Sequence, residues 1–384
     1  MCFLLSARKL RVKTKRNVHG DEAIKMGGKS SKATAPEAAA PEYKTKKAAG
    51  PAKTSITASS GENDRLHRFL EERTHAGQRI DASLFRGVSL RFFEDFVRDN
   101  SIPDEATTKE VCEQFIKPTI AADLCAYADV VARTRPDDVS PTASYFVSHA
   151  WKYRFVDVVA SLRDFVKGNA LDPARTFLWF DIFVVNQNPS VQADFPKDFW
   201  TTTFVDAIGA IGHTLLVLAP WGNPVPLTRA WCLWEILSSV KHEAAGCKLT
   251  ICLSEHERES FVDTLANDYD KIMNLFCKID AHKAEAWSED DKEMIFAAIE
   301  AGPGFARVNE AVLGKMRTWL AATGAAAAEA KKAKEGATAG VAKLLNHVAL
   351  LLKSQVRYKY KPFSMLWSAF LLRVVEPYYA DAAK

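Results

Sequence analysis

The chain has 384 residues, of which 48% are hydrophobic, enough for a large core in one decorated domain or in two ordinary domains. Its net charge of +4 is uneven: residues 1–55 hold 13 Lys and Arg against 4 Asp and Glu, and residues 331–384 hold 10 against 3. The whole chain has 51 Lys and Arg and 47 Asp and Glu, so residues 56–330 hold 28 basic against 40 acidic residues. An acidic centre argues against a core that binds nucleic acid, and basic ends permit contact with a membrane surface or an acidic partner.

Residues 1–60 are rich in Ala, Lys, Pro, Ser and Thr, a composition typical of a disordered basic leader. Within them the run MGGKSS, from Met26 to Ser31, matches the N-myristoylation pattern M-G-x-x-x-[ST]. The acyl chain requires Gly27 to be the first residue, so the pattern is functional only if translation starts at Met26. An acylated Gly27 beside the lysines that follow it would place the protein at a membrane surface. The alternative is an accidental match in a linker.

Residues 62–135 form the second region, where apolar residues recur at helical spacing. Leu66, Phe69 and Leu70 share one helix face, and a further helix is expected over 116–131. This spacing predicts a helical extension packed on the main domain.

Residues 144–280 alternate between strand-like and helix-like stretches. Strands are expected at 145–150, 177–183, 214–219, 248–253 and 275–279, with helices at 155–166, 204–211, 229–242 and 256–267. Continuous apolar strands separated by amphipathic helices are typical of a parallel sheet covered on both faces. The pattern therefore predicts an α/β fold, a flavodoxin-like doubly wound parallel sheet of about five strands with added helical segments at both ends.

The C-terminal part of the chain is expected to be helical. Helices over 290–300 and 308–320 complete an α/β domain at 144–322, followed by an Ala, Lys and Gly linker at 323–340. Residues 341–384 then form a helical basic segment, with a basic and aromatic stretch at 357–361. That stretch has the composition of a headgroup or nucleic-acid contact, although a solvated connector is the commoner role of such a segment.

Cysteine usage and hydropathy indicate a compartment. The seven cysteines are scattered, with no CxxC pair, which predicts reduced thiols in the cytoplasm rather than a disulfide framework or a metal site. No apolar run reaches the ~18 residues that a membrane-crossing helix needs, and the apolar start is too short for a secretory signal.

Three motifs follow one another on the α/β elements: FVSHAW from Phe146, WFDIFVVNQN from Trp179 and RAWCLWEI from Arg229. The first resembles the F-I-S-H-A box of bacterial TIR domains. The second resembles the second-strand region of TIR domains and the W-I-D-x-x-C-I-N-Q motif of fungal heterokaryon-incompatibility (HET) domains. The third is similar to S-x-W-C-L-x-E-L of plant TIR domains. The resemblance covers residues 144–280 and is carried by the order of the motifs on alternating strands and helices.

The resemblance implies a signalling enzyme that hydrolyses NAD. Many TIR domains cleave the nicotinamide–ribose bond, and their catalytic glutamate matches Glu235 here. NAD would be the substrate, with no resident cofactor, and the domain would self-associate into homo-oligomers. A single carboxylate suffices for this chemistry, because it stabilises the oxocarbenium-like ribose while nicotinamide leaves as a neutral molecule.

Further site residues are expected where the parallel strands end, since ligands of such sheets bind at their carboxyl edge. These candidate substrate-binding residues are Ser148, His149, Trp151, Asp181, Trp221 and Trp231. Each has a structural alternative: Glu235 in an ion pair with Arg229, His149 as a satisfied histidine that closes a strand, Asp181 bonded to backbone amides, and each Trp in the core.

Two other functions compete with hydrolysis. One is a non-catalytic TIR-like module that self-associates and is held at a membrane by its basic, acylated tails. The other is a flavodoxin-like nucleotide binder, but the chain has no GxGxxG, P-loop or flavin-phosphate loop. The loop after the second motif, 186–200, also departs from the Gly-containing loop of TIR domains, which leaves substrate binding and assembly open.

Overall fold

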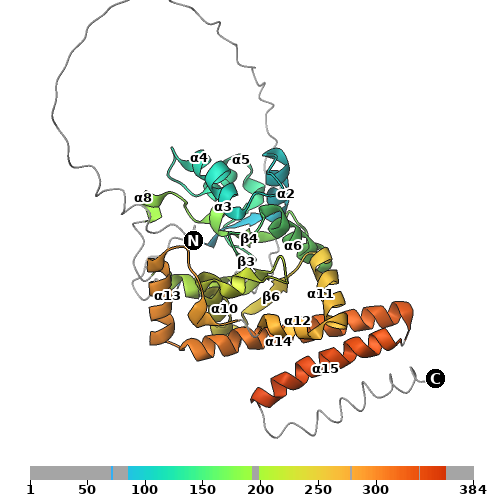
Figure 1. Cartoon of the computed structure of the whole chain (residues 1–384). Helices are drawn as coiled ribbons and strands as arrows, with labels where there is room; N and C mark the ends of the chain where they lie inside the picture. Colours follow the sequence, from blue (N-terminus) through green and yellow to red (C-terminus); the bar gives the residue numbers. More distant parts are fainter. Residues whose placement is uncertain (1–70, 72–84, 193–198, 277–278, 337, 360–384) are drawn as a thin grey trace, which may run out of the picture.

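A computed structural model describes residues 71, 85–192, 199–276, 279–336 and 338–359, and confirms the α/β class (Figure 1). The predicted leader at 1–60, its Gly27 and the end of the C-terminal segment, 360–384, lie outside the described residues. One sheet runs through the middle of the molecule. Its strands are β1 (Gly87–Ser89), β2 (Val139–Ser140), β3 (Tyr145–Ser148), β4 (Phe177–Trp179), β5 (His213–Val217) and β6 (Lys248–Cys252), in the order β2-β1-β4-β3-β5-β6.

The sheet is mixed, so the expectation of a parallel sheet throughout is wrong. Strands β4, β3, β5 and β6 are parallel, but β1 runs antiparallel to β4, and β2 antiparallel to β1. The two additional strands have only three and two residues, too few to show an alternating pattern in the sequence. The fifth parallel strand expected at 275–279 is also wrong, because Leu275 and Phe276 end a helix.

The helices occupy both faces of this sheet. On one face are α2 (Leu90–Asp99), α3 (Thr108–Val111), α4 (Lys117–Ile120), α5 (Tyr127–Thr134), α6 (Phe155–Gly168) and α7 (Asp181–Val184), with α8 (Pro189–Gln192) following. A π-helical turn (Cys112–Ile116) joins α3 to α4. On the other face lie α9 (Thr203–Ile211), α10 (Ala230–Lys241), α11 (Glu255–Asn267), α12 (Tyr269–Phe276), α13 (Glu289–Ala301), α14 (Phe305–Glu335) and α15 (Ala339–Lys359).

The central strands are apolar on both sides because each side has its own core. Val147 and Leu215 face the core beneath α2 and α6, whereas their neighbours Phe146 and Leu216 face the core beneath α9 and α10. Successive side chains of a strand point to opposite faces, so a strand buried on both sides has to be continuously apolar. This is the pattern from which the strands were predicted.

The expected helical extension is an integral part of this body. Among its described residues, 85–135, helices predominate as expected, but β1 places Val88 within the sheet, opposite Leu178 of β4. Phe93 and Phe96 of α2 pack into the same core as Val147 and Phe155. Within residues 85–135, no separate core divides the helices from the α/β domain.

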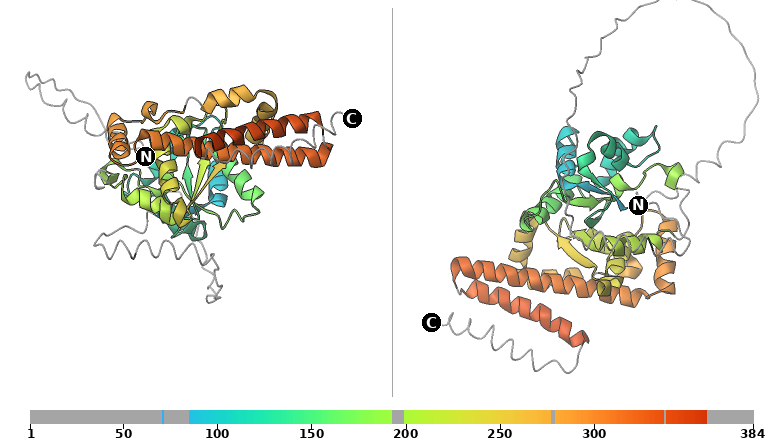
Figure 2. Two further views of the ribbon diagram at one scale, coloured as in Figure 1. Left: turned by 90° about the horizontal axis from the view of Figure 1, so that it is seen from below. Right: turned by 180° about the vertical axis from the view of Figure 1, so that it is seen from behind.

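The expected linker at 323–340 is wrong. Helix α14 runs without interruption to Glu335, and only Gly336 to Thr338 separate it from α15. Ala, Lys and Glu are strong helix formers, so a low-complexity run of them extends a helix that is already nucleated. Gly324 serves close packing, since a Cβ there would lie 2.6 Å from a methyl carbon of Val348. Figure 2 shows α14 and α15 side by side as a long hairpin.

An aromatic cluster anchors α7, the short helix that begins at Asp181. Phe183 is fully buried, and its ring centroid lies 4.9 Å from that of Phe93 and 5.3 Å from that of Phe96, both in edge-on contact. Phe183→Ala is expected to lower the free energy of unfolding by about 3–5 kcal/mol, because the deletion leaves a cavity among rings that cannot collapse.

Urea denaturation of the full chain measures this loss. Leu124→Ala is the matched control: Leu124 is 51% exposed, and its truncation should change the free energy of unfolding by less than about 0.5 kcal/mol. A loss below about 1 kcal/mol for Phe183→Ala would show that the cluster is not a packed core.

The described part of the chain contains no helix that combines the length and the apolar character needed to cross a bilayer. The cysteines within it form no disulfide with one another: Cys112, Cys125, Cys232, Cys247 and Cys252.

Candidate functional site

Glu235 lies in the second turn of α10, the helix that follows β5. Its neighbours Trp231, Leu233 and Ile236 are buried, because α10 is enclosed between the sheet on one side and α13 and α14 on the other. Glu235 itself is 8% exposed. A carboxyl group in such surroundings needs a polar partner.

That partner is Ser148, the last residue of β3. Its hydroxyl donates a hydrogen bond of 2.6 Å to Glu235 Oε2. The two residues are 87 positions apart and meet because β3 and β5 are parallel neighbours, so that the end of β3 lies beside the helix that follows β5. The candidate residues of the first and third motifs are therefore in direct contact.

Burial raises the pKa of Glu235 to about 8. The hydrogen bond from Ser148 stabilises the carboxylate and acts in the opposite direction, while the negative charge of Asp181 raises the pKa further. Burial therefore favours the protonated form of this carboxyl group at neutral pH. Shifts of this kind are concentrated at functional sites.

Glu235 lies in a cleft of about 270 Å³ at the carboxyl edge of the sheet. The chain proceeds from β3 to β4 on one side and later to β5 on the other, and a crevice opens where the direction of winding reverses. The cleft is lined by Thr107, Lys109, His149, Ala150, Trp151, Lys152, Asp181, Val225, Arg229, Trp231, Cys232, Glu235 and Trp287.

Asp181 and Trp151 form a second polar pair in this cleft. The indole Nε1–H of Trp151 donates to Asp181 Oδ2 at 2.6 Å, and the backbone N–H of Ile182 donates to Oδ1 at 2.8 Å. Asp181 therefore bonds a backbone amide at the start of α7, as the structural alternative proposed, and also lines the cleft. The bond from Trp151 fixes this ring at the cleft wall.

His149 follows Ser148 and is 7% exposed. Its ring stacks on Phe180, with 4.3 Å between centroids, and burial lowers its pKa to about 4. The ring is therefore neutral. Nε2 has no hydrogen-bond partner among the described residues, so the alternative of a fully satisfied histidine does not describe it. A buried nitrogen of this kind is a candidate for bonding to a ligand.

The two remaining tryptophans have different positions. Trp231 lines the cleft, where its Nε1–H donates to Asp291 Oδ2 at 3.2 Å. Trp221 is not among the cleft residues: its Nε1–H donates to Ser260 at 3.3 Å, and its ring packs edge-on against Phe261. The structure therefore brings six of the seven predicted residues together, counting Ser148 through its bond to Glu235, and leaves Trp221 in the core.

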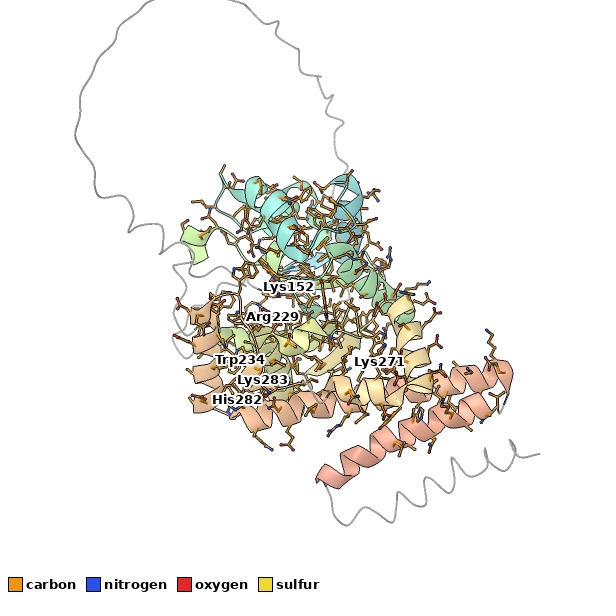
Figure 3. All side chains as sticks on the ribbon, in the orientation of Figure 1. Lys152, Arg229, Trp234, Lys271, His282 and Lys283 are labelled. Atoms are coloured by element: carbon orange, nitrogen blue, oxygen red, sulfur yellow. The ribbon has the colours of Figure 1, made fainter. Side chains whose placement is uncertain are left out.

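Sequence reasoning missed the more exposed part of the cleft lining, called the mouth below, which consists of Lys109, Lys152, Arg229 and Trp287. Lys152 and Trp287 are exposed, and Lys109 and Arg229 are partly exposed. Figure 3 shows Lys152 and Arg229 close together near the middle of the molecule, with Lys271 well apart from them. Lys152 directly follows the first motif, so its position near the site could have been predicted from the sequence. Arg229 was considered only as a partner of Glu235, but its Nη1 lies 3.7 Å from Glu285 Oε2.

Comparisons with known proteins find no family model, no curated protein and no solved structure that matches this chain. Within the described residues, no group of three or more His, Cys, Asp or Glu side chains is arranged to hold a metal ion.

Proposed function

We propose that the chain is a TIR-like signalling enzyme that hydrolyses the nicotinamide–ribose bond of NAD, with Glu235 as its catalytic carboxylate. The hydrogen bond between Ser148 and Glu235 is the observation that carries the proposal, because it joins the first and third motifs at the floor of one cleft. The order of the parallel strands supports it. Across the sheet these strands lie in the order β4, β3, β5, β6. They are the second, first, third and fourth parallel strands along the chain, which is the strand order of a flavodoxin-like sheet.

The proposed reaction needs one carboxylate and one water. The bond between C1′ and the pyridinium nitrogen breaks, and its electron pair stays on the nitrogen, so nicotinamide leaves neutral. The water oxygen bonds to C1′, and its proton passes to Glu235 and then to solvent. The Glu235 carboxylate stabilises the positive charge that develops on the ribose.

The raised pKa of Glu235 fits a cationic substrate. A buried carboxyl group loses its proton more readily when a positive charge enters the same cleft. The pyridinium ring of NAD supplies that charge, whereas the reduced, neutral ring of NADH does not. The cleft would therefore ionise its own catalytic group as the substrate binds.

The direct test is incubation of the full chain with NAD at high protein concentration, with nicotinamide and ADP-ribose separated by chromatography. Release of both products in equal amounts is expected. Absence of release over a range of protein concentrations would refute the hydrolase.

The pH dependence provides a further prediction. Because kcat/KM reports the ionisation of the free enzyme, it should rise with pH and level off above about 8, the pKa of Glu235. The profile of kcat should level off at lower pH, since the bound pyridinium favours the carboxylate. Initial rates between pH 5.5 and 9.5 measure both profiles; coincident profiles would contradict ionisation by the substrate.

The alternative function is a TIR-like module that self-associates without catalysis. The burial of Glu235 and its hydrogen bond with Ser148 favour it, because a carboxyl group held in this way also serves as a structural contact. Under either function, we propose that the protein forms homo-oligomers. We also propose that it is cytoplasmic and is held at a membrane through Gly27 and the basic ends of the chain.

A further inference from the structure

The mouth of the cleft carries positive charge from three separate parts of the chain. Lys109 comes from α3, Lys152 from the loop after β3, and Arg229 from the residue before α10. Glu285, whose exposed carboxylate lies 3.7 Å from Arg229, offsets part of this charge. The floor, in contrast, carries the carboxyl groups of Glu235 and Asp181. A ligand that matches this arrangement has an electron-poor ring at one end and an anionic group a short distance away.

Backbone hydrogen bonds hold both sides of the mouth in place. On one side, the Lys109 N–H donates to the carbonyl of Trp151 at 3.1 Å, which places α3 against the loop that bears Lys152. On the other, the Ala230 N–H donates to the carbonyl of Glu285 at 2.9 Å, and the Glu285 N–H donates to Thr228 at 2.8 Å. Arg229 is therefore fixed beside the segment that contains Trp287.

A cation–π contact joins the two sides. Lys109 Nζ lies 4.0 Å from the centre of the Trp287 ring, and Trp287 is 45% exposed at the mouth. This contact keeps the ammonium group at the entrance and restricts its movement. A large exposed aromatic side chain beside several cations is also the kind of surface on which a nucleobase stacks.

The size of the cleft limits how much of a ligand it can enclose. At about 270 Å³ it lies just below the ~300–1000 Å³ of ordinary ligand pockets, which suits a ring with its ribose rather than a whole dinucleotide. With the ring beside Glu235, the group attached to the far side of the ribose would lie at the mouth.

We propose that the mouth is an anion subsite that binds the pyrophosphate of a dinucleotide through Lys109, Lys152 and Arg229. This proposal rests on the proposed function, because the ligand is oriented with its nicotinamide ring at the floor of the cleft. It adds which residues of the chain bind the pyrophosphate of that substrate, apart from the reacting ring. The three cations form charge-assisted bonds to phosphate oxygens, and the planar guanidinium of Arg229 can bind two of them.

The test is calorimetric titration of the full chain with ADP-ribose, which carries the pyrophosphate but no nicotinamide, and with adenosine, which carries no phosphate. ADP-ribose should bind at least about 10-fold more tightly than adenosine, and the double variant Lys109→Met/Lys152→Met should weaken ADP-ribose about 10-fold or more. Lys271→Met, an exposed lysine on α12 away from the cleft, is the matched control and should not change the Kd.

The outcomes separate the subsite from the hydrolase. Equal affinity for ADP-ribose in the wild type and the double variant, or no binding of ADP-ribose, overturns the subsite even if nicotinamide is released from NAD. Lysine-dependent binding of ADP-ribose without nicotinamide release supports the subsite and refutes the hydrolase. Thermal unfolding of the double variant checks that both substitutions leave the fold intact.

Discussion

Glu235→Gln is expected to lower kcat for nicotinamide release by about 10³-fold, the cost typical of removing one group that stabilises transition-state charge. The amide retains the size of the side chain and can still accept the hydrogen bond that Ser148 donates at 2.6 Å in the wild type. The fold should therefore change little. KM should rise, because a carboxylate that is favoured by the bound pyridinium also favours binding of the pyridinium. What is lost is the negative charge opposite the developing positive charge on the ribose.

Glu300→Gln is the matched control, since Glu300 is exposed on α13 and outside the cleft. Its kcat should equal that of the wild type. Single-turnover measurements with NAD separate the chemical step from product release. Release by Glu235→Gln at the wild-type rate would show that the nicotinamide–ribose bond is broken without this carboxylate.

Ser148→Ala probes the same site from the other side of the hydrogen bond. The hydroxyl stabilises the ionised form of Glu235, so its removal raises the pKa of Glu235 further above about 8. At pH 7 a smaller fraction of the enzyme is ionised, and kcat/KM should fall by about 10-fold. Raising the pH should restore part of this loss, whereas it should not restore the activity of Glu235→Gln.

The second large effect concerns stability. The pKa of Glu235 is about 8 in the folded protein, against an ordinary value of 4.5. Between these values the folded state holds a proton that the unfolded state has lost. The contribution of Glu235 to the free energy of unfolding is therefore complete below about pH 4.5 and declines as the pH rises to about 8, by up to about 1.4 kcal/mol for each pH unit.

Glu235→Gln removes this titration, so the measured quantity is the difference between the wild type and the variant. Relative to the variant, the wild type should lose stability between about pH 5 and pH 8, as followed by urea denaturation at several pH values. The comparison is necessary because burial lowers the pKa of His149 and His213 to about 4, which changes the total stability in the opposite direction at acidic pH. A constant difference across this range would contradict the burial of an ionisable Glu235. Glu300→Gln should follow the wild type throughout.

The sequence was sufficient to predict the elements whose pattern depends on local contacts. The parallel strands β3, β4, β5 and β6 are continuously apolar because both of their faces are covered, and four of the five expected strands lie where this pattern places them. The same pattern failed at Leu275 and Phe276, which were expected to begin a strand but end helix α12. Such short runs do not distinguish a strand from a helix, since both bury the same side chains.

The composition of residues 323–335 led to a wrong expectation for a similar reason. Ala, Lys and Gly in a low-complexity run are common in linkers, but Ala and Lys are also strong helix formers. The preceding turns of α14 nucleate the helix, and Ala328 and Gly324 then pack against its neighbours. Composition alone does not show whether a partner helix is present to bury those small side chains.

For the candidate site, the sequence by itself determined which residues stand at the ends of the strands: Ser148 and His149 after β3, Asp181 after β4, and Glu235 on the helix after β5. Parallel strands bring these ends to one edge, so their proximity followed from the order of the elements. Only the tertiary structure decided that Ser148 donates its hydrogen bond to Glu235, that Trp221 packs against Phe261, and that Lys109 reaches Trp287 across the mouth. Those contacts join segments up to 178 residues apart, as between Lys109 and Trp287, and depend on where folding brings distant side chains, which no local pattern records.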